Sequence, residues 1–329
     1  MGEDFYRVLI KKIINNIPDN KKPVNYLMDI LNIGRESTYR RLRGNIPFTF
    51  DEIIKLSLSL DFSIDEIIGR GNGSNAFFYN LQQKKPSDYN ELFYITHLDF
   101  YNILVSASNA KDTEILFSIN HITSFFALHF NCLFKFYYYI WMHQCGGISS
   151  NCSFSEIELP SNIASIQQKI KSTITLIPNI TCIFDQYLIM RLARTLQYYY
   201  SRNLFSHEEL EVIKSEVIGF IDYIEKFLQI RANGTGMTYN FYLSLLEIDM
   251  NSMYGTYDNS TISHYWTCNV NSVNTGNSDL IALHKNWMHS LKRSSILISQ
   301  SNEIVQASFL NLQRENIERV TKDTFLYYG

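Results

Sequence analysis

Positive charge is concentrated between Arg35 and Arg43, in the stretch RESTYRRLR. Four arginines and one glutamate share these nine residues, whereas the whole chain of 329 residues carries a formal net charge of −3. An arginine guanidinium can form two parallel hydrogen bonds with phosphate oxygens or with the edge of a guanine base. The segment could therefore bind nucleic acid if its arginines share an exposed face, although a run of charge is more commonly a solvated helix face without a ligand.

The residues around Arg35–Arg43 predict two helices joined by a tight turn. Pro23 suits the first position of a helix, and four apolar residues after it share one helix face, namely Val24, Leu27, Met28 and Leu31. Asn32–Gly34 interrupts this pattern, and Gly44 ends the arginine-rich segment. Two helices joined in this way form a helix-turn-helix, whose second helix enters the major groove of DNA.

Three further helices are predicted around this pair. Apolar spacing predicts a helix over residues 3–17. Thr49–Glu52 and Ser63–Glu66 are capping boxes, which open a fourth helix and a short fifth helix. The glycine-rich stretch that follows predicts a linker at residues 70–76. We therefore expect a separate five-helix domain at residues 1–69.

Val24–Gly69 resembles the lambda-repressor-like, or Cro-type, helix-turn-helix domain of bacterial transcriptional regulators. The pieces of that pattern occur in order: an apolar-striped helix, the turn Leu31–Gly34, a polar helix ending at Gly44, then Pro47 and Ser63–Ile67. With the first helix included, the resemblance covers about 65 residues, a fifth of the chain. It implies a domain that binds double-stranded DNA in a sequence-specific manner.

The position of each residue in this pattern implies its role. The side chains expected at base edges are Arg35, Glu36, Tyr39 and Arg40, and those expected at phosphates are Lys22, Asn25, Arg41 and Arg43. The family usually has an apolar residue at the position of Arg41, whereas here the apolar residue is Leu42. We expect Thr38 and Leu42 to form the inner face of the recognition helix, whose rotation stays open.

Residues 77–329 are expected to form a larger, α-rich regulatory or dimerisation domain, so that the whole chain is mainly α. Alternating residues in ISHYWTCNV, together with TYNFYLSLLEIDM, predict a small antiparallel sheet near 237–273, with His264 as a hydrogen-bonded core histidine. Helices are predicted at 88–106, 113–143, 159–175, 179–201, 207–230, 279–292 and 303–322.

Aromatic residues make up 14% of the chain and cluster at Phe136–Tyr139 and Tyr198–Tyr200. Such runs indicate either a pocket for a flat, apolar effector or ordinary core packing, and core packing is the commoner use. The apolar run Ile122–Met142 is long enough to cross a bilayer, but His129 and Lys135 lie within it. We therefore expect a buried helix and no membrane association.

The sequence contains no pattern typical of catalysis, of a metal site or of a cofactor site. The eight histidines lack the spacing of a zinc site, and there is no Cys-x-x-Cys, nucleophile elbow, phosphate loop or dinucleotide-binding fingerprint. We therefore expect no enzyme, no metal and no cofactor. The five widely spaced cysteines indicate free thiols in a reducing cytoplasm.

Together these patterns predict a cytoplasmic transcriptional regulator that binds DNA as a homodimer, because two half-sites add their contacts. The second domain would dimerise the protein, sense a small-molecule or peptide effector, or do both. Two alternatives stay open. One is a peptide-sensing regulator, although the chain lacks a 34-residue repeat. The other is a protein-interaction module, antitoxin-like or an adaptor, whose helical N-terminal domain binds protein.

Overall fold

The structure is a computed structural model of the chain. It describes residues 2–18, 21–60, 62, 64, 67, 78–79, 88–229, 238–258, 260–267, 270–275, 277–299 and 302–321. The chain divides into two compact units, Met1–Phe77 with Asn277–Leu280 and Phe78–Gly276 with Ile281–Gly329, which we call the helical unit and the sheet unit. The predicted linker at 70–76 lies outside the described residues, as do three of the four residues of the second capping box.

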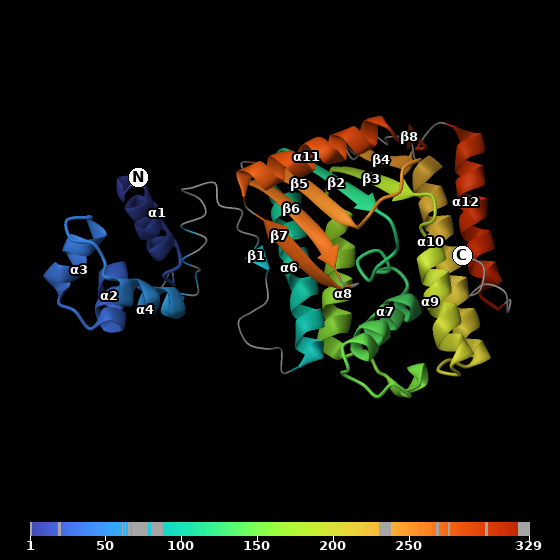
Figure 1. Cartoon of the computed structure of the whole chain (residues 1–329), viewed down its shortest axis with the longest axis horizontal. Helices are drawn as coiled ribbons and strands as arrows, with labels where there is room; N and C mark the ends of the chain where they lie inside the picture. The colour runs from blue at the N-terminus through green and yellow to red at the C-terminus, as the bar shows by residue number, and fades with distance from the viewer. Residues whose placement is uncertain are drawn as a thin grey trace. The chain divides into compact units, whose positions relative to one another are not determined.

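The helical unit contains four helices in its described part (Figure 1). They are α1 (Gly2–Asn15), α2 (Pro23–Leu31), α3 (Arg35–Leu42) and α4 (Phe50–Leu60). Their apolar faces form one small core, since α1 contributes Leu9 and Ile13, α2 contributes Leu27, and α4 contributes Leu56, all fully buried. The core therefore draws together helices that are far too short to be stable alone.

The sheet unit is built on an eight-stranded mixed sheet, in the order β1-β7-β6-β5-β2-β3-β4-β8. Three neighbouring strands at its centre, β2, β3 and β4, are parallel, and the remaining pairs are antiparallel. The strand bounds are β1 (Phe78–Tyr79), β2 (Thr113–Ile119), β3 (Asn179–Asp185), β4 (Thr238–Ser244), β5 (Ser252–Tyr257), β6 (Ser260–Thr267), β7 (Asn271–Thr275) and β8 (Ile296–Leu297).

Helices cover both faces of this sheet, as Figure 1 shows for α11 on one side. On that side Met288 of α11 packs against Leu116 and Tyr254, and Leu291 packs against Ile183. The main core lies on the opposite face. The helices of this unit are α6 (Tyr89–Asn109), α7 (Asn131–Gln144), α8 (Ser161–Ile174), α9 (Met190–Ser201), α10 (His207–Gln229), α11 (Ser278–Arg293) and α12 (Glu303–Glu318), with short 3₁₀ turns at Phe154–Glu156 and Arg319–Thr321.

The prediction of a mainly α chain with a small antiparallel sheet near 237–273 is wrong. Thr113–Ile119 and Asn179–Asp185, both predicted as parts of helices, are the central parallel strands β2 and β3. Both strands are buried along almost their whole length. A strand covered on both faces has a continuous apolar sequence without period-two alternation, so its pattern cannot be told from that of a buried helix.

The predicted strand around Ile262–Trp266 exists, but both of its faces are covered. His264 and Trp266 of β6 are buried and lie on the main-core side, where both rings pack against Phe100. Ser263 and Tyr265 contact His284 of α11 on the other side. The apolar run Ile122–Met142 includes part of α7 and a preceding series of turns. Among the described residues, no helix combines the length and apolarity that a membrane crossing requires.

Candidate functional site

The turn between α2 and α3 has the geometry that its sequence predicts. Asn32 follows α2 in the left-handed conformation, with φ of 53°. Gly34 precedes α3 in an extended conformation, and its carbonyl oxygen accepts hydrogen bonds from the amide and the hydroxyl of Thr38 at 3.0 and 3.2 Å. Thr38 is completely buried. These contacts fix where α3 begins and turn Thr38 towards the core.

The end of α3 is defined by Gly44. Its φ of 77° is a conformation that residues with a Cβ adopt only with strain. The amide of Gly44 donates to the carbonyl of Arg41 at 3.0 Å, and the amide of Asn45 donates to the carbonyl of Arg40 at 2.9 Å. This pair of bonds is the Schellman motif, which satisfies carbonyl groups left open at a helix end.

Tyr6 of α1 holds the chain just after α3. Its hydroxyl lies 3.1 Å from the carbonyl oxygen of Arg41 and 3.0 Å from that of Ile46, and it accepts a hydrogen bond from the amide of Phe48 at 3.1 Å. Burial raises the pKa of Tyr6, so the hydroxyl keeps its proton for donation. One side chain of α1 thus fixes the segment that leads from α3 to α4.

Arg41 joins α3 to the first turn of α4. Its guanidinium donates to both carboxylate oxygens of Glu52, with Nε–Oε2 and Nη2–Oε1 distances of 2.9 and 2.8 Å. Glu52 also accepts from the amide of Thr49 in the predicted capping box. Burial alone would raise the pKa of Glu52, but the hydrogen bonds from Arg41 and Thr49 outweigh it and lower the pKa. Arg41, predicted as a phosphate contact, is thus engaged within the protein.

The opposite side of α3 is exposed. Glu36 and Arg40, two residues before and after the buried Thr38, lie about 160° around the helix from it. Arg35 and Arg43 are also exposed, and their guanidinium carbons lie 5.9 and 5.7 Å from the ring centroid of the half-buried Tyr39. The four residues predicted at base edges therefore share one side of α3, where three of them are exposed and Tyr39 is half-buried. The expected inner-face residue Leu42 packs at the margin of the core.

Further basic side chains border this surface. Lys22 and Asn25, predicted as phosphate contacts, are exposed at the start of α2. Arg7 and Lys11 of α1 are exposed as well, and together with Arg43 they line one shallow hollow. Sequence reasoning did not single out Arg7 and Lys11, although their spacing of four residues places both on one helix face. The structure adds them to the candidate phosphate-binding residues.

The sheet unit contains a chain of buried hydroxyl and imidazole groups. The Ser252 hydroxyl lies 3.0 Å from Nε2 of His284, whose Nδ1 lies 2.9 Å from the Ser263 hydroxyl. Ser118 continues the chain, with its oxygen 2.7 Å from that of Ser252. A serine beside a histidine suggests a nucleophile and its base. However, all four side chains are buried beneath α11, and burial lowers the pKa of His284 to about 4. This series of hydrogen-bonded side chains connects α11 to the sheet, and its burial leaves a substrate no access to it.

His264 differs from its prediction as a hydrogen-bonded core histidine. It is completely buried, but neither ring nitrogen has a hydrogen-bond partner among the described residues. Burial lowers its pKa to about 3, so the ring is neutral. Among all the residues that the structure describes, no group of three or more histidine, cysteine or acidic side chains is arranged to hold a metal ion.

The exposed face of α3 is the candidate functional site, because it collects the charged side chains that the helix-turn-helix pattern singles out. The groups that orient it, Thr38, Gly44, Tyr6 and the Arg41–Glu52 pair, lie behind it or at its ends. No protein-family model, no curated protein and no solved structure matches this chain.

Proposed function

We propose that the helical unit binds double-stranded DNA in a sequence-specific manner, with α3 in the major groove. The observation that carries this proposal is the exposed face of α3, where Glu36 and Arg40 lie opposite the buried Thr38. A helix of this diameter fits the major groove, where its outward side chains reach the base edges. The contacts behind α3, above all the Arg41–Glu52 pair, hold this face in a fixed orientation.

The residues divide between reading bases and binding the backbone. Arg35, Glu36, Tyr39 and Arg40 are proposed at base edges, where an arginine pairs with guanine and a glutamate accepts from cytosine. The proposed phosphate contacts are Lys22, Asn25, Arg43, Arg7 and Lys11. Arg41 is left out of this set because Glu52 occupies its guanidinium.

The proposed role of the whole chain is transcriptional regulation as a homodimer in the cytoplasm. A single small domain makes few contacts, and a dimer on two half-sites adds a second set at a high effective concentration. Free thiols at Cys132, Cys152 and Cys182 support a reducing compartment. The sheet unit would supply dimerisation, signal sensing or both.

Salt dependence of binding tests this proposal against the alternative that the helical unit binds protein. The full chain is titrated with a fluorescent random-sequence duplex between about 50 and 200 mM salt, where phosphate-driven affinity falls by orders of magnitude. Arg43→Ala should weaken binding to every duplex and reduce the slope of log K against log salt by about 1. Lys111→Ala, which removes one positive charge from an exposed turn of the sheet unit, is the matched control. Binding that does not change with salt would contradict the proposal.

A further inference from the structure

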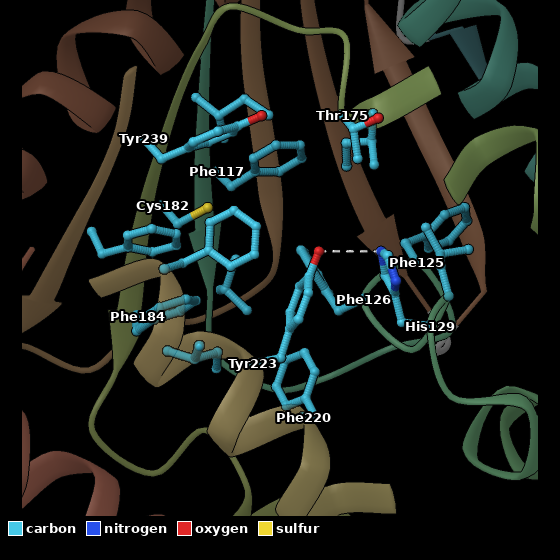
Figure 2. Close-up of a pocket in the computed structure, with 17 residues that line it drawn as sticks. Phe117, Phe125, Phe126, His129, Thr175, Cys182, Phe184, Phe220, Tyr223 and Tyr239 are labelled. Carbon is cyan, nitrogen blue, oxygen red and sulfur yellow. Dashed lines mark hydrogen bonds between the residues drawn. The ribbon is translucent and has the colours of Figure 1, made fainter. Parts of the chain in front are cut away.

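A cavity of about 150 Å³ lies on the main-core face of the sheet, within the sheet unit. Its floor is formed by alternate residues of the parallel strands, Phe117 of β2, Cys182 and Phe184 of β3, and Phe241 of β4, all buried. Helix α10 closes one side with Phe220, Tyr223, Ile224 and Phe227. Figure 2 shows these side chains arranged around an open centre.

The lining is apolar and mostly aromatic. Among the residues that the structure describes, seventeen line the cavity; nine of them are phenylalanine or tyrosine and none is Asp, Glu, Lys or Arg, so this lining favours an uncharged ligand. Cys182 points into the cavity (Figure 2), and burial raises the pKa of its thiol to about 12, so it stays neutral. An apolar pocket of about 150 Å³ has room for one benzene-sized ring.

The lining also includes polar groups, namely the hydroxyls of Thr175, Tyr223 and Tyr239 and the ring of His129. The Tyr223 hydroxyl of α10 lies 3.3 Å from Nε2 of His129, the bond drawn as a dashed line in Figure 2. Both side chains are half-buried, in contrast to the buried floor. A tyrosine hydroxyl has one proton and two lone pairs, so after this bond it can still donate to or accept from a third group. Burial, with Lys171 nearby, lowers the pKa of His129 and keeps its ring neutral.

We propose that this cavity binds one small, uncharged, monocyclic aromatic molecule, whose single hydroxyl or carbonyl group hydrogen-bonds to Tyr223. The aromatic floor supplies the contacts for the ring, and the Tyr223–His129 pair orients it. The sequence offered a weaker indication in its aromatic content, but the clusters Phe136–Tyr139 and Tyr198–Tyr200 do not line this cavity. The inference does not rest on the proposed DNA binding.

Phenol and toluene are suitable probes, since they have similar size and differ in the hydroxyl group. Each is titrated into the full chain without DNA, with binding followed by ligand-observed NMR. In Tyr223→Phe, the ratio of phenol affinity to toluene affinity should fall about tenfold, because the phenol hydroxyl loses its hydrogen-bond partner. Tyr265→Phe, on the sheet face packed against α11, should leave this ratio unchanged. Cys182→Leu fills part of the cavity and should weaken binding of both probes at least tenfold.

The expected result is that both probes bind saturably to the wild-type chain. Cys182→Leu should weaken the binding of both probes, and Tyr223→Phe should lower the ratio of phenol affinity to toluene affinity. Absence of binding to the folded wild-type chain would overturn the proposal, and so would equal binding to Cys182→Leu. An unchanged affinity ratio in Tyr223→Phe would overturn the assigned hydrogen bond; this variant keeps the ring and so remains informative if Cys182→Leu does not fold. Because no DNA is present, these outcomes are independent of the outcome for the helical unit.

Discussion

The guanidinium of Arg41 binds both carboxylate oxygens of Glu52 and so joins α3 to the first turn of α4. Both side chains are largely buried, with 12% and 14% of their area exposed. Arg43, two positions further, is exposed. Two arginines at the end of α3 therefore lie in opposite environments, one within the protein and one on its surface.

This relationship predicts opposite effects for two arginine substitutions. Arg41→Ala leaves Glu52 without its charged partner, so the free energy of unfolding of the helical unit should fall by about 1–3 kcal/mol. Arg43→Ala should change it by less than about 0.5 kcal/mol, as is usual at exposed sites. Thermal and urea unfolding of the full chain measure both values. Equal destabilisation by the two variants would contradict the assignment.

Gly44 offers a second test of how α3 is positioned. Gly44→Ala places a Cβ at φ of 77° and should lower the free energy of unfolding of the helical unit by about 1–2 kcal/mol. Gly34→Ala is the matched control, because Gly34 has an ordinary φ of −70° and no atom within 4 Å of the added Cβ. Urea unfolding compares the two, and a loss from Gly34→Ala as large as that from Gly44→Ala would refute the role of the Schellman turn.

The two units should respond differently to acid. Burial lowers the pKa of His97, His121 and His284 to about 4 and that of His264 to about 3, below the ordinary 6.5. Between pH 6.5 and the lowered pKa values, these histidines bind protons in the unfolded chain but stay neutral in the folded sheet unit. The stability of this unit is therefore intact above pH 6.5 and falls as the pH drops from 6.5 towards 4, by roughly 1.4 kcal/mol per unit of pKa shift for each group.

The helical unit has no histidine in residues 1–77, and its acid response begins lower. The lowered pKa of Glu52 means that the contribution of its ion pair is complete above 4.5 and is lost as the pH falls through the lower, folded value. As the pH falls from 7 to 5, calorimetry should show a lower unfolding temperature for the sheet unit and an unchanged one for the helical unit. His264→Leu should make the change in the sheet unit smaller, whereas His207→Gln, at an exposed position, should not. Parallel shifts of both transitions would contradict this account.

How much of this molecule could be predicted from its sequence depends on whether the signal is local. The turn Asn32–Gly34, the stop at Gly44 and the capping box Thr49–Glu52 depend on neighbouring residues, and each occurs where it was predicted. Strands β2 and β3 are covered on both faces, so their residues carry no alternation and were assigned to helices.

Features that the sequence does not predict depend on contacts between residues that are distant in the chain. The helix-turn-helix pattern predicts Arg41 as a phosphate contact. Its actual partner Glu52 lies eleven residues away on another helix, so the local pattern does not indicate it. The cavity in the sheet unit is lined from three parallel strands, the end of α8, α10 and the segment before α7, a set that no single stretch of sequence contains. His264 was correctly predicted as buried, but its lack of partners depends on the side chains packed around β6.

The central claim is that the exposed face of α3 reads DNA sequence, and selection from a random-sequence duplex pool tests it most directly. The full chain should enrich an inverted repeat with half-sites about one helical turn apart. Arg40→Ala should relax the preference at a single position of each half-site, while Lys111→Ala should select the same sequence as the wild type. Absence of any enriched sequence at low salt, or an identical preference in Arg40→Ala, would contradict the account.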